Sequence, residues 1–104
     1  IGISCSQLTA QTVHIEAGTY LNIEADTWLN VQGENDTSLV NRGTVNNFGT
    51  LNLANTNSVA LKNEGALTNH DCASLTTDNP THNNGVLQND GIITTTAHHY
   101  FQIE

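Results

Sequence analysis

Apolar residues recur two positions apart in short triplets that turn-forming residues separate. The clearest run begins at Ile15, where Ile-Glu-Ala-Gly-Thr-Tyr-Leu-Asn is followed from Ile23 by the close copy Ile-Glu-Ala-Asp-Thr-Trp-Leu-Asn. Since residues two apart share one face of a strand, each triplet directs two apolar side chains to the same side. The pattern predicts short, half-buried strands, of which the first three are centred on Val13/Ile15, Leu21/Ile23 and Leu29/Val31.

A second repeat, Asn-x-Gly-x-apolar, occurs in couplets farther along the chain. The first members begin at residues 41, 63 and 83, so the period is 22 and then 20 residues. A fixed period of this length is typical of one turn of a solenoid. The corner residues of the couplets are Asn41, Gly43, Asn47, Gly49, Asn63, Gly65, Asn69, Asp71, Asn83, Gly85, Asn89 and Gly91, with Asp71 in the place of a glycine.

The two repeats fit one register, which predicts an all-β fold. We expect a single-stranded parallel β-helix, or β-solenoid, of about four coils, with a period of roughly 20 to 24 residues and three faces per coil. Residues 1–12 are then an N-terminal arm or partial coil, residues 13–98 the solenoid, and residues 99–104 a C-terminal strand that starts an incomplete coil. The predicted core rows are Leu21/Ile23, Val45, Leu67, Leu87; Leu29/Val31, Leu51/Leu53, Ala73/Leu75, Ile93/Thr95; and Val13/Ile15, Leu39, Val59/Leu61, Thr81, Phe101/Ile103.

The corners have an expected physical basis. A sharp turn between strands requires left-handed or bridging backbone angles, which Gly adopts freely and Asn tolerates. Stacking should align the first Asn of each couplet in one column and the second Asn in another, so that side-chain amides hydrogen-bond from coil to coil. An antiparallel sandwich is the alternative, because Asn and Gly between apolar residues also mark hairpins. The fixed period favours the solenoid.

Composition narrows the classes of function. Two basic residues against ten acidic ones give a net charge of -8, which disfavours nucleic acid and anionic membrane surfaces as partners. Fifteen Asn and fifteen Thr suit turns and the outer faces of strands, and no apolar run is long enough to span a membrane. A start at Ile1 without Met, two Cys and a sequon at Asn35 favour a secreted, extracellular protein whose leader has been removed, with Asn35 as a candidate glycosylation site.

The Asn-x-Gly-x-Leu couplets, from about Leu39 to Thr95, resemble the repeats of right-handed parallel β-helices in secreted bacterial adhesins of the filamentous-haemagglutinin kind. The coil length is similar to that of curli-type amyloid subunits. The resemblance is one of repeat style, and it implies adhesion, biofilm or fibre formation outside the cell. The regularly spaced Ser, Gln and Asn strand positions of curli repeats are absent from this chain.

Candidate chemistry is sparse, and the sequence predicts neither an enzyme nor a cofactor. The adjacent pair His98 and His99 would point to opposite faces of a strand, which disfavours chelation of a metal. The acidic turn Glu34-Asn35-Asp36 is expected to be solvated, because the repeat of calcium-binding solenoids is missing. No nucleophile elbow, phosphate loop or Cys-x-x-Cys motif occurs.

Two aromatic residues and two cysteines remain. Tyr20 and Trp28 hold equivalent positions in the octads and should point outward, either to contact a glycan or partner or to lie beneath the apolar N-terminal arm. Two Cys in an exported chain usually pair, so Cys5 and Cys72 are expected to form a disulfide. The expected stacking separates them by more than about 10 Å, so the bond needs an arm that runs along the flank or a neighbouring chain.

The expected function is a structural subunit of an extracellular filament that polymerises head to tail through open solenoid ends. A free-standing solenoid needs caps, whereas Tyr100-Phe-Gln-Ile-Glu104 is strand-like and apolar. The expected partners are copies of the same chain and, secondarily, surface glycans. The alternative is a glycan- or surface-binding adhesin module, monomeric or part of a longer chain. The expected subunit interface comprises Ile1, Ile3, Leu8, Tyr100, Phe101 and Ile103.

Overall fold

The computed structural model describes residues 2–3, 6–9, 12–78, 81–95 and 101–103, and every regular element in these residues is a β-strand. The strands are short because turn-forming residues separate one apolar triplet from the next. Their bounds are β1 Gly2–Ile3, β2 Ser6–Thr9, β3 Val13–Ile15, β4 Tyr20–Ile23, β5 Trp28–Gly33, β6 Leu39–Asn41, β7 Thr44–Asn47, β8 Thr50–Asn55, β9 Leu61–Asn63, β10 Ala66–Asn69, β11 Ser74–Thr77, β12 Thr81–Asn83, β13 Val86–Asn89, β14 Ile92–Thr95 and β15 Phe101–Ile103.

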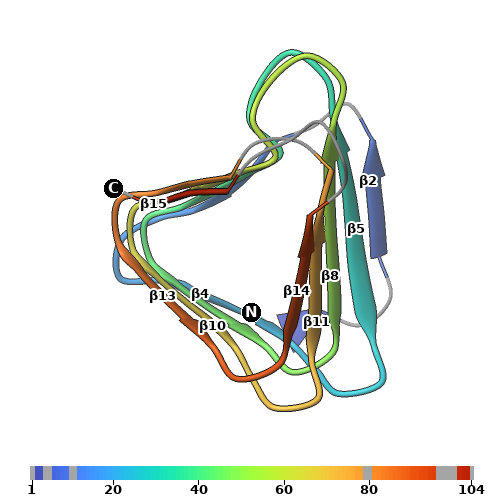
Figure 1. The fold of residues 1–104 in the computed structure, drawn as a ribbon, viewed down its shortest axis with the longest axis vertical. Helices are drawn as coiled ribbons and strands as arrows, with labels where there is room; N and C mark the ends of the chain where they lie inside the picture. The colour runs from blue at the N-terminus through green and yellow to red at the C-terminus, as the bar shows by residue number, and fades with distance from the viewer. Residues whose placement is uncertain (1, 4–5, 10–11, 79–80, 96–100, 104) are drawn as a thin grey trace.

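The strands form three parallel sheets of five strands each, in which every strand pairs with the strand three places along the chain. We name them sheet A (β1-β4-β7-β10-β13), sheet B (β2-β5-β8-β11-β14) and sheet C (β3-β6-β9-β12-β15). Each coil therefore gives one strand to each sheet, and the sheets enclose a triangle when seen along the stacking direction (Figure 1). The predicted parallel β-solenoid of about four turns is confirmed.

The observed register reproduces most of the predicted core rows. Leu21, Val45, Leu67 and Leu87 align across sheet A as expected. On sheet B, however, Leu75 aligns with Leu51 and not with Leu53, so that prediction is wrong by two residues. The reason is that the turn between β10 and β11 takes four residues, against two between β7 and β8, which moves Ala73 out of the strand and into the turn.

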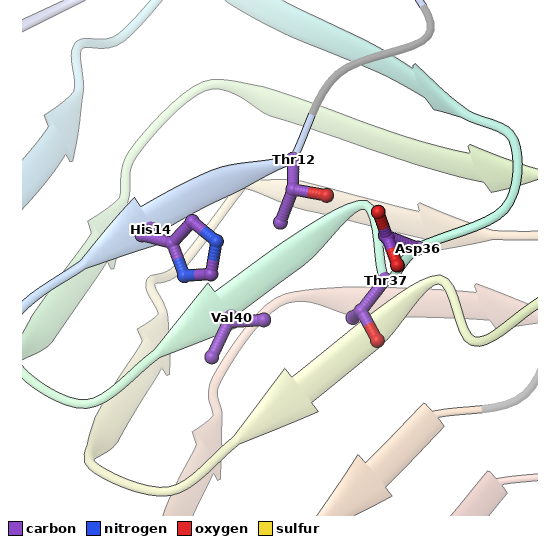
Figure 2. A pocket seen from close by; sticks show the side chains of 5 residues that line it. All are labelled: Thr12, His14, Asp36, Thr37 and Val40. Atoms are coloured by element: carbon purple, nitrogen blue, oxygen red, sulfur yellow. The ribbon is translucent and has the colours of Figure 1, made fainter.

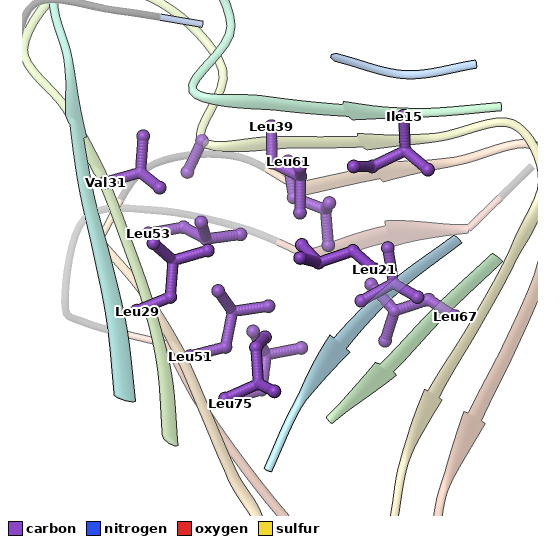
Figure 3. Packing of buried hydrophobic residues seen from close by; sticks show 13 residues of the cluster. Ile15, Leu21, Leu29, Val31, Leu39, Leu51, Leu53, Leu61, Leu67 and Leu75 are labelled. Atoms are coloured by element: carbon purple, nitrogen blue, oxygen red, sulfur yellow. The ribbon is translucent and has the colours of Figure 1, made fainter. Parts of the chain in front are cut away.

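The core is a column of aliphatic side chains that all three sheets supply. Alternate residues are buried along most of the strands from β3 to β12, as in the pattern of β8, where Leu51, Leu53 and Asn55 point inward. Figure 3 shows these side chains converging on the interior from the three walls of the triangle. The buried cluster contains Ile15, Leu21, Ile23, Leu29, Val31, Leu39, Val45, Leu51, Leu53, Ala60, Leu61, Leu67 and Leu75.

The two ends of the chain continue the solenoid. Strands β1 and β2, in the segment predicted as an arm or partial coil, pair in parallel with β4 and β5 and place Ile3 in register with Ile23 and Leu8 with Val31. At the other end β15 pairs with β12, where Phe101 aligns with Thr81 and Ile103 with Asn83. Of the expected interface residues, Ile1 and Tyr100 lie outside the described residues.

We expect Leu51→Ala to lower the free energy of unfolding by about 3 kcal/mol, because it opens a cavity where a side chain with no exposed surface packs on the rows above and below. Chemical denaturation followed by circular dichroism measures the change. The control is Val86→Ala, whose side chain is 64% exposed and should cost well under 1 kcal/mol. Equal losses for the two variants would contradict the packing described here.

Candidate functional site

The turns between sheets form three stacked columns, and the repeat's glycines lie at two of them. We call these the CA corner, between sheets C and A, and the AB corner, between sheets A and B. A Cβ added to Gly65 would overlap the carbonyl oxygen of Gly43 in the coil below and lie 2.7 Å from the carbonyl carbon of Arg42. A Cβ on Gly85 would likewise overlap the carbonyl oxygen of Gly65. The repeat therefore needs glycine because successive backbones touch at the corners.

This corrects the expectation that the corner glycines adopt left-handed angles. Among the described residues, positive φ occurs at Gly18, Asp26 and Cys72, none of which belongs to the predicted corner set. Asp26 and Cys72, with φ of 64° and 67°, occupy the longer turns that lead into β5 and β11. The turn that contains Asp71 is two residues longer than the turn between β7 and β8, and its left-handed residue is Cys72. Asp71 therefore does not take the place of a glycine.

Two amide ladders run along the corners. Asn41 donates from Nδ2 to Oδ1 of Asn63 at 2.8 Å, and Asn63 donates in turn to Asn83 at 2.7 Å. On the AB corner the ladder runs from Asn47 to Asn69 to Asn89, with distances of 2.8 and 2.9 Å. The first four of these side chains along the chain, Asn41, Asn47, Asn63 and Asn69, have no exposed surface. The ladders thus satisfy buried amides that would otherwise be costly.

Each rung of a ladder has a direction. The Nδ2 group of each internal Asn also donates to a backbone carbonyl of the next coil: Asn41 to Ala66, Asn47 to Ser74, Asn63 to Val86 and Asn69 to Ile92. The Oδ1 atom accepts from the amide of the corner glycine in the same coil, as in Asn47 with Gly49. Donors therefore point toward the C-terminal coils and acceptors toward the N-terminal ones.

Both ends of the solenoid present strand edges. Among the described strands, β13 pairs only with β10, β14 only with β11, and β15 only with β12, while β1, β2 and β3 are the outer strands at the opposite end. In the last coil Val86 and Ile92 are 64% and 65% exposed, and Leu87 and Ile93 are only partly buried. The corresponding inward residues one coil below, Leu67 and Leu75, are completely buried. The inward side chains of the described C-terminal coil are therefore less completely covered than those one coil below.

The charged side chains of the described residues lie almost entirely at the corners. The strand residues that point outward from sheets A and B are uncharged, whereas sheet C carries His14, Lys62 and His82 on its outer face. At the CA corner Arg42 forms an ion pair with Glu64 at 3.0 Å. Sheet B presents outward a set of neutral residues, namely Trp28, Asn30, Gln32, Thr50, Asn52, Ala54, Ser74, Thr76, Ile92 and Thr94.

The two outward aromatics are exposed, Tyr20 by 52% and Trp28 by 38%. The expectation that the N-terminal arm covers them is wrong, because β1 and β2 instead extend sheets A and B. The sequence analysis missed a third aromatic site. Phe48 and His70 stack at the AB corner with ring centroids 4.0 Å apart, a pair whose residues are separated by one coil period and could have been aligned from the repeat.

The loops after β5 and β8 project from the triangle at the corner between sheets B and C (Figure 1). Asn55, which is 5% exposed, joins them by donating to the Asp36 carbonyl at 2.6 Å and to the Ser38 hydroxyl at 3.1 Å. Its Oδ1 accepts from the amides of Asn57 and Ser58. The sequence signals a turn here, but not that one side chain holds two loops together.

A pocket of about 370 Å³ lies beside these loops and is lined by Thr12, His14, Asp36, Thr37 and Val40. Figure 2 shows the His14 ring and the Asp36 carboxylate at opposite sides, with Thr12 between them and Thr37 next to Asp36. Both His14 and Asp36 are exposed, and the pocket is open to solvent. The candidate glycosylation residue Asn35 is exposed on the same loop, where its Oδ1 accepts from Asn57 at 3.1 Å.

Cys72 is an exposed, free cysteine, and no disulfide is present among the described residues. Cys5 lies outside them. In sequence, Cys5 lies between β1 and β2, and Cys72 lies between β10 and β11. Within their sheets, β1 is three strands from β10 and β2 is three strands from β11, which is about 14 Å at ordinary strand spacing. A disulfide needs Cα atoms within about 7 Å, so a bond within one chain would require Cys5 to lie away from these strands. The disulfide, within one chain or between chains, stays a prediction.

The described histidines are dispersed. His14 and His82 lie on sheet C and His70 at the AB corner, while His98 and His99 lie outside the described residues. No group of three or more His, Cys, Asp or Glu side chains in the described part of the chain is placed to hold a metal ion. Nor does that part contain a helix with the length and apolarity needed to cross a membrane.

We expect Asn63→Ala and Gly65→Val each to lower the free energy of unfolding by about 1 to 3 kcal/mol. The first removes one of the two acceptors of Asn41 Nδ2 and the donors to Asn83 Oδ1 and the Val86 carbonyl, and the second forces side-chain atoms against the backbone of the coil below. Thermal and chemical denaturation measure both. The control Asn84→Ala removes an exposed corner amide and should be neutral; full stability of Asn63→Ala would show that the ladder is dispensable.

No protein-family model, curated protein or solved structure significantly matches this chain, so the geometry described above is the basis for assigning a function.

Proposed function

We propose that this chain is a structural subunit that polymerises head to tail into an extracellular filament. The observation that carries the proposal is that both ends of the described solenoid are strand edges belonging to the same three sheets. An unpaired strand edge presents N–H and C=O groups that favour pairing with another chain. Because every pairing is parallel, a second copy can add to either end without reversing the direction of the chain.

Each end of the solenoid presents one outer strand from each of the three sheets. Strands β13, β14 and β15 of one copy would face β1, β2 and β3 of the next, one strand on each side of the triangle. The partly buried Leu87 and Ile93 would be covered by that contact, as Leu67 and Leu75 are covered within the chain. This is a heterologous contact, and it builds an open polymer when the rotation between copies does not close a ring.

Charge also supports end-to-end contact over contact through the corners. A chain with net charge -8 repels its own copies, and the described acidic residues lie at the corners, around the rim of the triangle. The inward side chains at the C-terminal end, among them Leu87 and Ile93, are neutral. Stacking therefore joins copies at the part of the molecule where like charges are farthest from the contact. Raised salt should favour the polymer, because it screens repulsion between rims.

The intact chain should form unbranched filaments, and deletion of residues 100–104 should leave a folded subunit that stays monomeric. The deletion removes β15 and with it one of the three strands offered at the C-terminal end; β12 loses this partner and becomes the edge strand of sheet C, while the other strand pairs are kept. Sedimentation velocity and electron microscopy measure assembly, and circular dichroism checks folding. An intact chain that is monomeric at high concentration would exclude the filament.

A second candidate, a binding module for neutral glycans, is favoured by one observation. The outer face of sheet B is flat and uncharged, and it surrounds Trp28 with amides and hydroxyls. Asn52 donates to Asn30 at 2.7 Å, which orders these side chains across adjacent coils. Amides and hydroxyls hydrogen-bond sugar hydroxyls, and an exposed indole packs on the apolar face of a sugar ring. Absence of charge disfavours anionic and cationic ligands.

For this candidate we expect Trp28→Ala to reduce binding to neutral polysaccharides about tenfold or more, through loss of the stacking surface. Affinity electrophoresis in gels that contain single neutral polysaccharides measures the retardation. Phe48→Ala is the matched control, since Phe48 is similarly exposed, by 41%, but lies at a corner and stacks on His70. Unretarded migration of the parent chain in every gel would remove the glycan candidate.

A further inference from the structure

The AB-corner ladder ends at Asn89 with its donor group unused. Asn47 and Asn69 each donate two forward hydrogen bonds from Nδ2, one to the next Asn and one to the first carbonyl of the sheet B strand in the next coil. Asn89 accepts from Asn69 and from the amide of Gly91, so its Oδ1 is satisfied. Among the described residues, its Nδ2 has no acceptor, and the side chain is exposed.

The CA-corner ladder ends differently. Asn83 donates to the Gly85 carbonyl in its own coil at 3.2 Å, and β15 places Ile103 in register above it. One hydrogen of its Nδ2 group therefore has an acceptor within the same coil. Among the described residues, the AB corner alone offers at the C-terminal end an Asn whose Oδ1 accepts two hydrogen bonds and whose Nδ2 has no acceptor.

The N-terminal end does not repeat the Asn donor of the C-terminal end. The positions that align below Asn41 and Asn47 are Ile15 and Ile23, so neither ladder extends into the first coils. The edges of β1, β2 and β3 present backbone N–H and C=O groups. A copy approaching Asn89 with this end would bring backbone carbonyls, the group that Nδ2 of Asn47 and Asn69 already uses in Ser74 and Ile92.

We propose that Asn89 is the docking donor of the C-terminal end, and that its Nδ2 group binds backbone carbonyls at the N-terminal edge of a second copy of this chain. This inference rests on the proposed filament and names a residue that would favour its head-to-tail polarity. In a head-to-tail joint the parallel stacking continues, so the Asn89 donor would meet the carbonyl position that Ser74 and Ile92 occupy within the chain, whereas two like ends do not repeat that register. Head-to-tail joints thereby gain hydrogen bonds that head-to-head and tail-to-tail joints do not make.

The test is Asn89→Asp in the full chain. This change keeps the oxygen that accepts from Gly91 and replaces the Nδ2 donor by an acceptor of similar size. The matched control is Asn84→Asp, which adds the same negative charge at an exposed corner position next to the completed ladder. The two variants should unfold at similar temperatures, which thermal denaturation of the monomers checks.

We expect Asn89→Asp to raise the critical concentration for polymerisation about tenfold, corresponding to the loss of roughly two neutral hydrogen bonds at each joint, while Asn84→Asp changes it little. Sedimentation of assembled material across a concentration series measures the value. Added in small proportion to the intact chain, Asn89→Asp should also slow elongation, because each incorporated copy presents a defective C-terminal end.

The outcomes separate the two proposals. Filaments from the intact chain with equal critical concentrations for both variants would overturn the role of Asn89 and leave the filament in place. Equal impairment of both variants would show that added charge, not the lost donor, is responsible, and would also overturn it. An intact chain that forms no polymer would overturn both proposals together.

Discussion

The close approach of successive backbones at the corners is the constraint on which the remaining structure depends. A Cβ at Gly43, Gly65 or Gly85 would overlap a carbonyl oxygen of the coil below, so these turns stack only when they carry no side chain. Stacked corners fix the register of the strands between them. That register in turn aligns the aliphatic rows and brings the Asn amides within hydrogen-bond distance. A single steric condition, repeated once per coil, thus organises packing and polar contacts together.

Most of the fold could be predicted from the sequence, because similar patterns of apolar and turn-forming residues recur in successive coils. The apolar triplets and the couplet period were enough to define three faces, since burial of alternate residues leaves little freedom in how coils align. The error at Leu75 arose where the repeat is irregular: a turn of four residues replaced one of two, and nothing in the local sequence shows which residue takes positive φ. The reason for the glycines was also not predictable, because overlap with the coil below is a tertiary property.

The candidate sites were less accessible to sequence analysis. Trp28 could be placed on an outer face from its octad, but its exposure depends on where β1 and β2 lie, and these strands continue the sheets. Asn55 and the Phe48–His70 pair act between coils, so single turns did not reveal them. The direction of the amide ladders was equally hidden, since a column of Asn residues has no polarity until donors and acceptors are assigned to atoms.

The core becomes less aliphatic toward the C-terminal end, and this affects the order in which the coils unfold. The inward row that holds Val31 and Leu53 continues with Thr77, and the row of Leu39 and Leu61 continues with Thr81. Both threonine hydroxyls are fully buried without a hydrogen-bond partner among the described residues. In a linear array each coil is stabilised mainly by its neighbours, so opening proceeds inward from the weaker terminus. The C-terminal coils should therefore separate more readily than the aliphatic coils that precede them, and a neighbour bound at that end would hold them closed.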